Sequence, residues 1–238
     1  MRMFGSERIM KVMDTLGLPA DTPIEHGLIS KSIEKAQSKV EKYYFGIRKQ
    51  ILEYDDVMNR QRETIYSLRR YFLAHQNLDD KLKELLHDLI KPLYNMFYHS
   101  PKPEDQDPEG FTERLQLIFP IQNLSELLNQ KGNVVESLTQ TAFQLYEHKK
   151  NTYPDGVFDE VVVKRILLGT LDRKWVDHLH QMELLREGIG LRAYGQKDPL
   201  IEYKMEAYDM FKALLLDIYE DSFQLIYRAS LEIQEGEE

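Results

Sequence analysis

Residues 178–211 read HLHQMELLREGIGLRAYGQKDPLIEYKMEAYDMF and contain two helical patterns with an interruption between them. Asp198 followed by Pro199 predicts the start of the second helix, because aspartate caps a helix and proline suits its first position. Glycine gives the backbone of the interruption conformational freedom. The interruption contains Gly188, Gly190 and Gly195. The stretch therefore predicts an antiparallel helical hairpin.

Apolar residues at helical spacing extend both patterns beyond this stretch. Before the interruption, the apolar stripe begins at Val162 and ends at Ile189, and after it a second stripe begins at Tyr208 and ends at Leu225. Two stripes of similar length can bury each other when the helices pack side by side. Trp175, the only tryptophan, lies on the first stripe, so we expect its side chain in the core.

The interruption also carries large apolar side chains, Ile189, Leu191 and Tyr194, which we expect to be exposed to solvent. The residues alone leave two interpretations of Tyr194 open. Its ring could fold back over Leu191 and the helix ends. Alternatively, the loop could present the ring, beside Arg192 and Lys197, to a partner, because large rings make contacts that tolerate many sequences.

An upstream apolar stripe runs from Ile33 to Phe72 in steps of three and four, apart from a gap at Gln61. It predicts one helix over residues 29–72, a range that contains no proline and only Gly46 as a glycine. A stripe of this length serves either as a coiled-coil seam or as a spine on which other units dock. Tyrosine and glutamine in the seam break the heptad and favour the spine.

Residues 76–153 predict shorter helices separated by an acidic, proline-rich loop, SPKPEDQDPEG. The pattern LDDKLKELLHDLI predicts a helix that stops or kinks before Pro92, and FTERLQLIF predicts one that ends at Pro120. SELLNQ predicts a short helix, and Asn133 is expected to cap the next one. The valines of VFDEVVVK, residues 157–164, could indicate a strand, but the acidic residues near its start favour the first turn of a helix.

Composition predicts an all-α protein and restricts its function. Leucine, glutamate, lysine and glutamine are abundant and glycine is scarce, which favours helices. Cysteine is absent, which excludes disulfides and thiolate zinc sites. A formal charge of -9 argues against a nucleic-acid partner. The sequence shows neither a membrane span nor a signal-peptide pattern, so we expect a cytosolic protein.

The sequence contains no glycine-rich phosphate loop, no serine nucleophile motif and no HExxH, so we expect no catalytic residues. Asp177, His178 and His180 resemble a metal site. However, positions two apart on a helix project to different faces, and we expect surface histidines and no metal. Asp55 and Asp56 resemble a carboxylate pair but diverge by about 100° on a helix. We expect them to bond to a docked unit.

Three strings of residues resemble the SecA family, the ATP-driven motors of bacterial preprotein export. They are FGSERI at residues 4–9, FGIRKQILEYDDVMNRQRETIYSLR at residues 45–69, and LDRKWVDHLHQMELLREGIGLRAYGQKDPLIEYKMEAYDMF at residues 171–211. The resemblance covers most of the chain and is weakest over residues 76–153. It implies an exit segment from the second motor domain (1–28), the long helix of the helical scaffold domain (29–75), the helical wing domain (76–153), and the scaffold's two-helix finger with the C-terminal end (154–238).

The resemblance also implies partners and contact residues. The finger is expected to enter the SecYEG channel, with Tyr194 contacting the translocating preprotein. The other finger-loop contacts that we expect are Ile189, Leu191, Arg192, Gln196 and Lys197. Arg192 and Lys197 are also candidates for contact with anionic lipid. The long helix is expected to dock the motor and polypeptide-binding domains through Arg48, Glu53, Tyr54, Asp55 and Asp56.

Parts of the family pattern have no counterpart in this sequence. The motor domains with their Walker motifs are missing, and so is the cysteine-containing zinc tail. We therefore expect a non-enzymatic module of a larger translocase at the cytoplasmic face of the inner membrane, with ATP and magnesium bound only by the motor domains. The alternative is a stand-alone coiled-coil or adaptor protein, for which a stable dimer is expected.

Overall fold

The computed structural model describes residues 27–98, 102–121, 124–128, 133–190 and 198–231. Every regular element within these residues is helical, which confirms the all-α prediction. The chain divides into two compact units, Met1–Asp56 and Val57–Glu238. The candidate site lies in the second unit.

Helix α2 (Gly27–Ala74) is the long helix that the apolar stripe predicts. In the first unit, α2 leaves several large apolar side chains exposed. They are Ile33, Tyr43, Tyr44, Phe45, Ile47, Ile51 and Leu52. In the second unit the same stripe is buried at Ile65, Leu68 and Phe72, so only this part of α2 contributes to the core.

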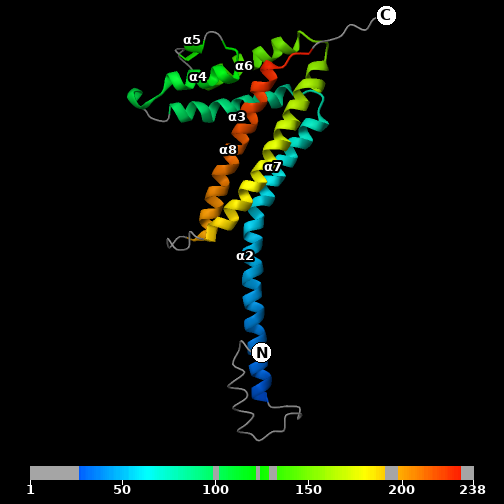
Figure 1. Cartoon of the computed structure of the whole chain (residues 1–238), viewed down its shortest axis with the longest axis vertical. Helices are drawn as coiled ribbons and strands as arrows, with labels where there is room; N and C mark the ends of the chain where they lie inside the picture. Colours follow the sequence, from blue (N-terminus) through cyan, green and yellow to red (C-terminus); the bar gives the residue numbers. More distant parts are fainter. Residues whose placement is uncertain (1–26, 99–101, 122–123, 129–132, 191–197, 232–238) are drawn as a thin grey trace, which may run out of the picture. The chain divides into compact units, whose positions relative to one another are not determined.

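The predicted hairpin is formed by α7 (Lys164–Gly188) and α8 (Pro199–Arg228), which run antiparallel and side by side (Figure 1). The Asp198 carboxylate accepts hydrogen bonds from the backbone N–H groups of Leu200 at 2.8 Å and Ile201 at 3.4 Å, which confirms the predicted cap. The valine-rich stretch before α7 is helical, as predicted. It forms the π-helix η2 (Phe158–Val163).

The segment between α2 and the hairpin contains α3 (Asp79–Phe97), the 3-10 helix η1 (Pro103–Asp105), α4 (Pro108–Ile118), α5 (Leu124–Leu128) and α6 (Val134–Lys150). Asn133 caps α6 as predicted, since its side-chain oxygen accepts from the Glu136 N–H at 3.3 Å. The expectation that the first of these helices could stop at Pro92 is wrong. Helix α3 continues to Phe97, because Pro92 lies on its exposed side while Leu89, Ile90 and Leu93 around it are buried.

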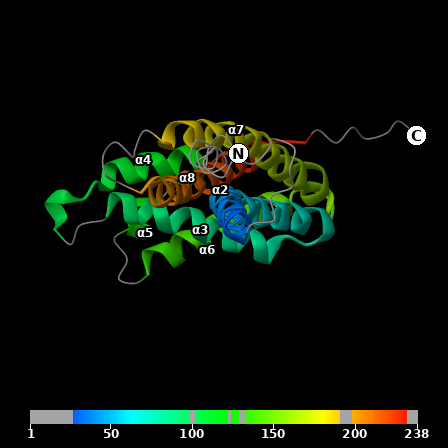
Figure 2. The ribbon, with the colours of Figure 1, turned by 90° about the horizontal axis from the view of Figure 1, so that it is seen from below.

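The C-terminal part of α8 belongs to the core of the α3–α6 segment, a packing that the sequence did not predict. Helices α3 and α4 both contact α8, and Figure 2 shows α8 between α7 and α3. The Tyr227 hydroxyl donates to the Ala142 carbonyl at 2.6 Å, and the rings of Phe119 and Tyr227 meet edge to face at 5.4 Å. One apolar cluster therefore extends through α3, α4, α6, α7 and α8.

A partly buried charged cluster joins α3, α6 and η2. Lys150 at the end of α6 lies 2.8 Å from Oδ1 of Asp79 and 2.8 Å from Oδ2 of Asp159. The Tyr146 hydroxyl donates to the carboxylate of Asp159, a residue with only 3% of its surface exposed. Burial and these carboxylates raise the pKa of Tyr146. Asp159 was expected only as an acidic residue near a helix start, but it is the centre of this cluster.

We expect alkaline pH to destabilise the chain partly through Tyr219 of α8. Burial, with the charges of Asp88 and Glu84, raises the pKa of Tyr219 to about 12. The folded chain thus holds this proton more tightly than the unfolded chain, so the stabilisation is complete below about pH 10 and is lost as the pH rises to about 12. Urea unfolding across this window should show a falling free energy of unfolding.

The Tyr219→Phe variant should show a smaller decrease, because phenylalanine has no proton to lose. Tyr208→Phe is the matched control, since Tyr208 lies on the same helix with 62% of its surface exposed. If the free energy of unfolding of Tyr219→Phe fell with pH as steeply as that of the unaltered chain, Tyr219 would not be the cause of the decrease.

Candidate functional site

Gln61 lies at the centre of a buried polar contact that joins three helices. The residue is 5% exposed, on the inward face of α2. Its Nε2 donates to the Ala207 carbonyl of α8 at 3.0 Å, and its Oε1 lies 2.8 Å from Nε2 of His178 on α7. Burial lowers the pKa of His178, which favours the neutral ring. Because the Gln61 oxygen can only accept, the tautomer that fits this contact carries its proton on Nε2 and donates to Gln61. The gap in the apolar stripe is therefore a connection between α2 and both hairpin helices.

The His178 ring is packed between aromatic side chains. Its centroid lies 5.6 Å from that of Trp175 and 5.9 Å from that of Phe211, and the residue is 2% exposed. The prediction of a surface histidine is wrong for His178 and confirmed for His180. Trp175 is buried as predicted. The signal in the sequence is the spacing of three and four between Trp175, His178 and Met182, which places His178 on the buried stripe of α7.

Helix α2 makes a second contact with α7 through an ion pair. Nε and Nη2 of Arg69 donate to the two carboxylate oxygens of Asp172 at 2.9 Å and 3.2 Å, a bidentate arrangement. The hydrogen bond and charge of Asp172 raise the pKa of Arg69. Both side chains are partly exposed, so this pair contributes little to the free energy of unfolding. Its bidentate geometry instead fixes how α2 and α7 face each other.

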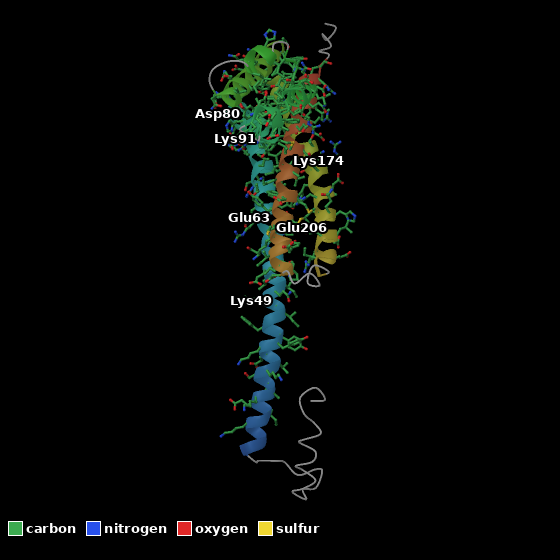
Figure 3. The ribbon with its side chains drawn as sticks, turned by 90° about the vertical axis from the view of Figure 1, so that its left-hand side faces the viewer. Lys49, Glu63, Asp80, Lys91, Lys174 and Glu206 are labelled. Atoms are coloured by element: carbon green, nitrogen blue, oxygen red, sulfur yellow. The ribbon has the colours of Figure 1, made fainter. Side chains whose placement is uncertain are left out.

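A groove of about 580 Å³ lies near the loop end of the hairpin. Its apolar lining comes from Met58 of α2, Leu179 and Met182 of α7, and Tyr203 of α8. Glu183, Arg186 and Glu187 supply its charged lining. The three helices of the Gln61 contact thus also border this groove, and Figure 3 shows them alongside one another, with Glu63 labelled on α2, Lys174 on α7 and Glu206 on α8.

The predicted loop contacts are only partly within the described residues. Leu191, Arg192, Tyr194, Gln196 and Lys197 lie outside them. Ile189 is described, and the expectation that its side chain is exposed is wrong, because the residue is 4% exposed. Its backbone N–H donates to the Leu185 carbonyl, so Ile189 continues the end of α7 and its buried stripe.

The predicted docking residues of the long helix all lie in the first unit. Arg48 and Asp56 are exposed, whereas Glu53, Tyr54 and Asp55 are half-buried. Glu53 also lies 4.0 Å from Lys49 one turn earlier, a contact that contributes little. Among the described residues there is no group of three His, Asp or Glu side chains able to hold a metal ion.

Comparison with known proteins assigns the chain to a family. A model of the SecA wing and scaffold domain matches residues 23–230. The chain belongs to the SecA wing and scaffold family. SecA relatives match nearly all of it, and the chain spans about a quarter of their length.

Three SecA relatives, each named protein translocase subunit SecA, illustrate this match. The relative from Chlorobaculum tepidum is 42% identical, with 96% of this chain and 22% of the relative covered. The relative from Pelotomaculum thermopropionicum is 42% identical, with 97% and 26% covered. The relative from Caldicellulosiruptor saccharolyticus is 41% identical, with 98% and 28% covered. None of the helices within the described ranges is long and apolar enough to cross a membrane.

Proposed function

We propose that the chain is a non-catalytic coupling module of a SecA protein-export motor. In this proposal α7 and α8 form the two-helix finger, α2 is the long scaffold helix, and residues 76–153 are the wing, between scaffold segments 29–75 and 154–238. Residues 1–28, of which 1–26 lie outside the described residues, would lead from the second motor domain. The family match supports this function over a stand-alone coiled coil. The observation that carries it is the Gln61 contact, because it attaches both finger helices to α2.

The finger loop is the proposed contact with preprotein and the SecYEG channel. Tyr194 would contact the moving chain, with Leu191, Arg192, Gln196 and Lys197 beside it. A large ring makes weak contacts with many side chains, which suits a substrate of changing sequence. The buried Ile189 would anchor the start of the loop to α7. Arg192 and Lys197 would also meet anionic lipid at the cytoplasmic face of the inner membrane.

A photo-crosslinking residue at position 194 of the complete translocase should capture a preprotein stalled in the SecYEG channel. The matched control places the same residue at position 208, an exposed site on the outer surface of α8. We expect preprotein adducts from position 194 and few from position 208. Adducts only with hairpin residues or channel loops would show that Tyr194 packs or docks and does not touch the substrate.

Helix α2 is the proposed docking surface for the motor domains. In this proposal ATP and magnesium bind to the motor domains and not to this module. The exposed apolar side chains before Asp56 support this surface, because Tyr43, Ile47 and Ile51 follow one another at helical spacing and a row of uncovered apolar side chains suits a protein interface. Arg48, Glu53, Tyr54, Asp55 and Asp56 would supply its polar contacts. Movement of the motor would then reach the finger through α2 and Gln61.

Arg48→Glu should weaken association of the chain with separately supplied SecA motor domains by about tenfold, since it reverses a charge on the docking surface. Calorimetric titration measures the change. Lys35→Glu, at an exposed position nearer the start of α2, is the control for charge reversal alone. If Arg48→Glu and the unaltered chain bound the motor domains with equal affinity, Arg48 would not be part of the interface.

A further inference from the structure

A groove of about 630 Å³ lies between α2 and α7 in the second unit, and the proposed finger function does not use it. Its apolar lining comes from Tyr66 of α2 and from Trp175 and Val176 of α7. Tyr66 is 47% exposed and Val176 is 63% exposed, whereas Trp175 lies beneath them at 5%. Large side chains at the surface of this groove are therefore available for a partner to cover.

The charged lining of the groove has a surplus of arginine. Arg69 and Asp172 neutralise each other through their bidentate pair. Arg62 donates to the Asn59 side chain at 3.1 Å and Arg70 to the Ser67 hydroxyl at 3.4 Å. Both partners are neutral, so within the described residues neither guanidinium has a carboxylate partner.

Glu63 is the only remaining carboxylate of the lining, against the two unpaired arginines. The groove is therefore locally positive, although the whole chain has a formal charge of -9. A positive groove on an acidic chain favours a partner with negative charge.

The residue types of the groove are those that dominate binding energy at protein interfaces. Arginine, tyrosine and tryptophan make up five of its eight lining residues. A guanidinium binds a carboxylate through two parallel hydrogen bonds, and an aromatic floor supplies a large apolar contact at low entropic cost. This combination fits a polypeptide better than a small apolar ligand.

We propose that this groove binds an acidic polypeptide segment that also carries an aromatic or aliphatic side chain. Carboxylates of the segment pair with Arg62 and Arg70. The apolar side chain covers Tyr66 and Val176 above Trp175. This surface lies on the flank of α2 and α7 and does not depend on the finger-loop proposal.

Trp175 makes the proposal directly measurable, because it is the only tryptophan of the chain and lines the groove. The probe is a tryptophan-free peptide of repeating Glu-Glu-Phe units, titrated into the 238-residue chain. We expect a saturable change in Trp175 fluorescence, matched by calorimetric binding, with an affinity that falls as salt concentration rises. The double variant Arg62→Glu with Arg70→Glu should bind at least about tenfold more weakly.

Two controls separate this groove from general charge effects. Arg165→Glu reverses an exposed charge elsewhere on α7 and should leave the affinity unchanged. The corresponding Lys-Lys-Phe peptide should not bind. Equal binding of the two peptides, equal losses in the Arg165→Glu and double variants, or no heat and no fluorescence change would overturn the proposal. A response to phosphatidylglycerol vesicles without a response to the acidic peptide would also overturn it, in favour of a membrane surface.

Discussion

Replacing Gln61 with alanine is expected to lower the free energy of unfolding by about 2–4 kcal/mol. The change removes a buried side chain and leaves the Nε2–H of His178 without its acceptor. It also removes the hydrogen bond to the Ala207 carbonyl, so α2 loses a connection to both hairpin helices at once. Urea unfolding followed by circular dichroism and by the fluorescence of Trp175 measures the loss.

Two further variants test whether the hydrogen bonds, rather than volume, cause this loss. Gln61→Met keeps most of the volume but leaves His178 unpaired, so we expect a cost of about 1–3 kcal/mol. Adding His178→Phe removes the unpaired donor, so the double variant should be more stable than the sum of the single effects predicts. Gln181→Ala, at an exposed site on α7, is the control and should change stability by less than about 0.5 kcal/mol. Strict additivity would show that Gln61 and His178 are not coupled.

Lys150→Met should destabilise the chain by about 3–5 kcal/mol, because it leaves the carboxylates of Asp79 and Asp159 without their cation in a mostly buried site. Burial alone would lower the pKa of Lys150, but the hydrogen bonds and charges of the two carboxylates raise it. The contribution of Lys150 is therefore complete below the unfolded pKa of 10.5 and is lost as the pH rises through the raised folded value.

The free energies of unfolding of the unaltered chain and of Lys150→Met should thus differ most at neutral pH and become similar in strong alkali. Lys91→Met is the control, because Lys91 is exposed on α3 and is expected to have little effect. If Lys150→Met were as stable as Lys91→Met, the ion pairs would contribute nothing net to folding.

Local patterns were sufficient to predict the main helices and some of their ends. Apolar spacing predicted α2 and the hairpin, and Asn133 and Asp198 were identified as caps from their chemistry and position. The error at Pro92 shows the limit of local reasoning. The burial of the leucines and isoleucine around Pro92 stabilises α3 by more than the proline costs, and that burial depends on other helices.

The polar centre of the candidate site could not be predicted, because it depends on residues that are distant in the sequence. Gln61 and His178 are separated by 117 positions, and Gln61 and Ala207 by 146. Periodicity shows which face of a helix is buried but not which polar side chains on different helices will meet. For the same reason Gln61 was interpreted as a gap, and Asp159 as a helix-start residue.

The division of α8 between two partners has a consequence for comparing members of this family. One part of α8 packs along α7, while Tyr227 and its neighbours complete the core of the α3–α6 segment. A chimera that exchanged only residues 76–153 between two relatives would pair one parent's inserted helices with the other parent's α8. A well-packed chimera therefore requires the end of α8 to come from the same parent as residues 76–153. A crossover point placed before residue 214 keeps the buried residues at the end of α8 together, since Leu214 is the first of them in this core.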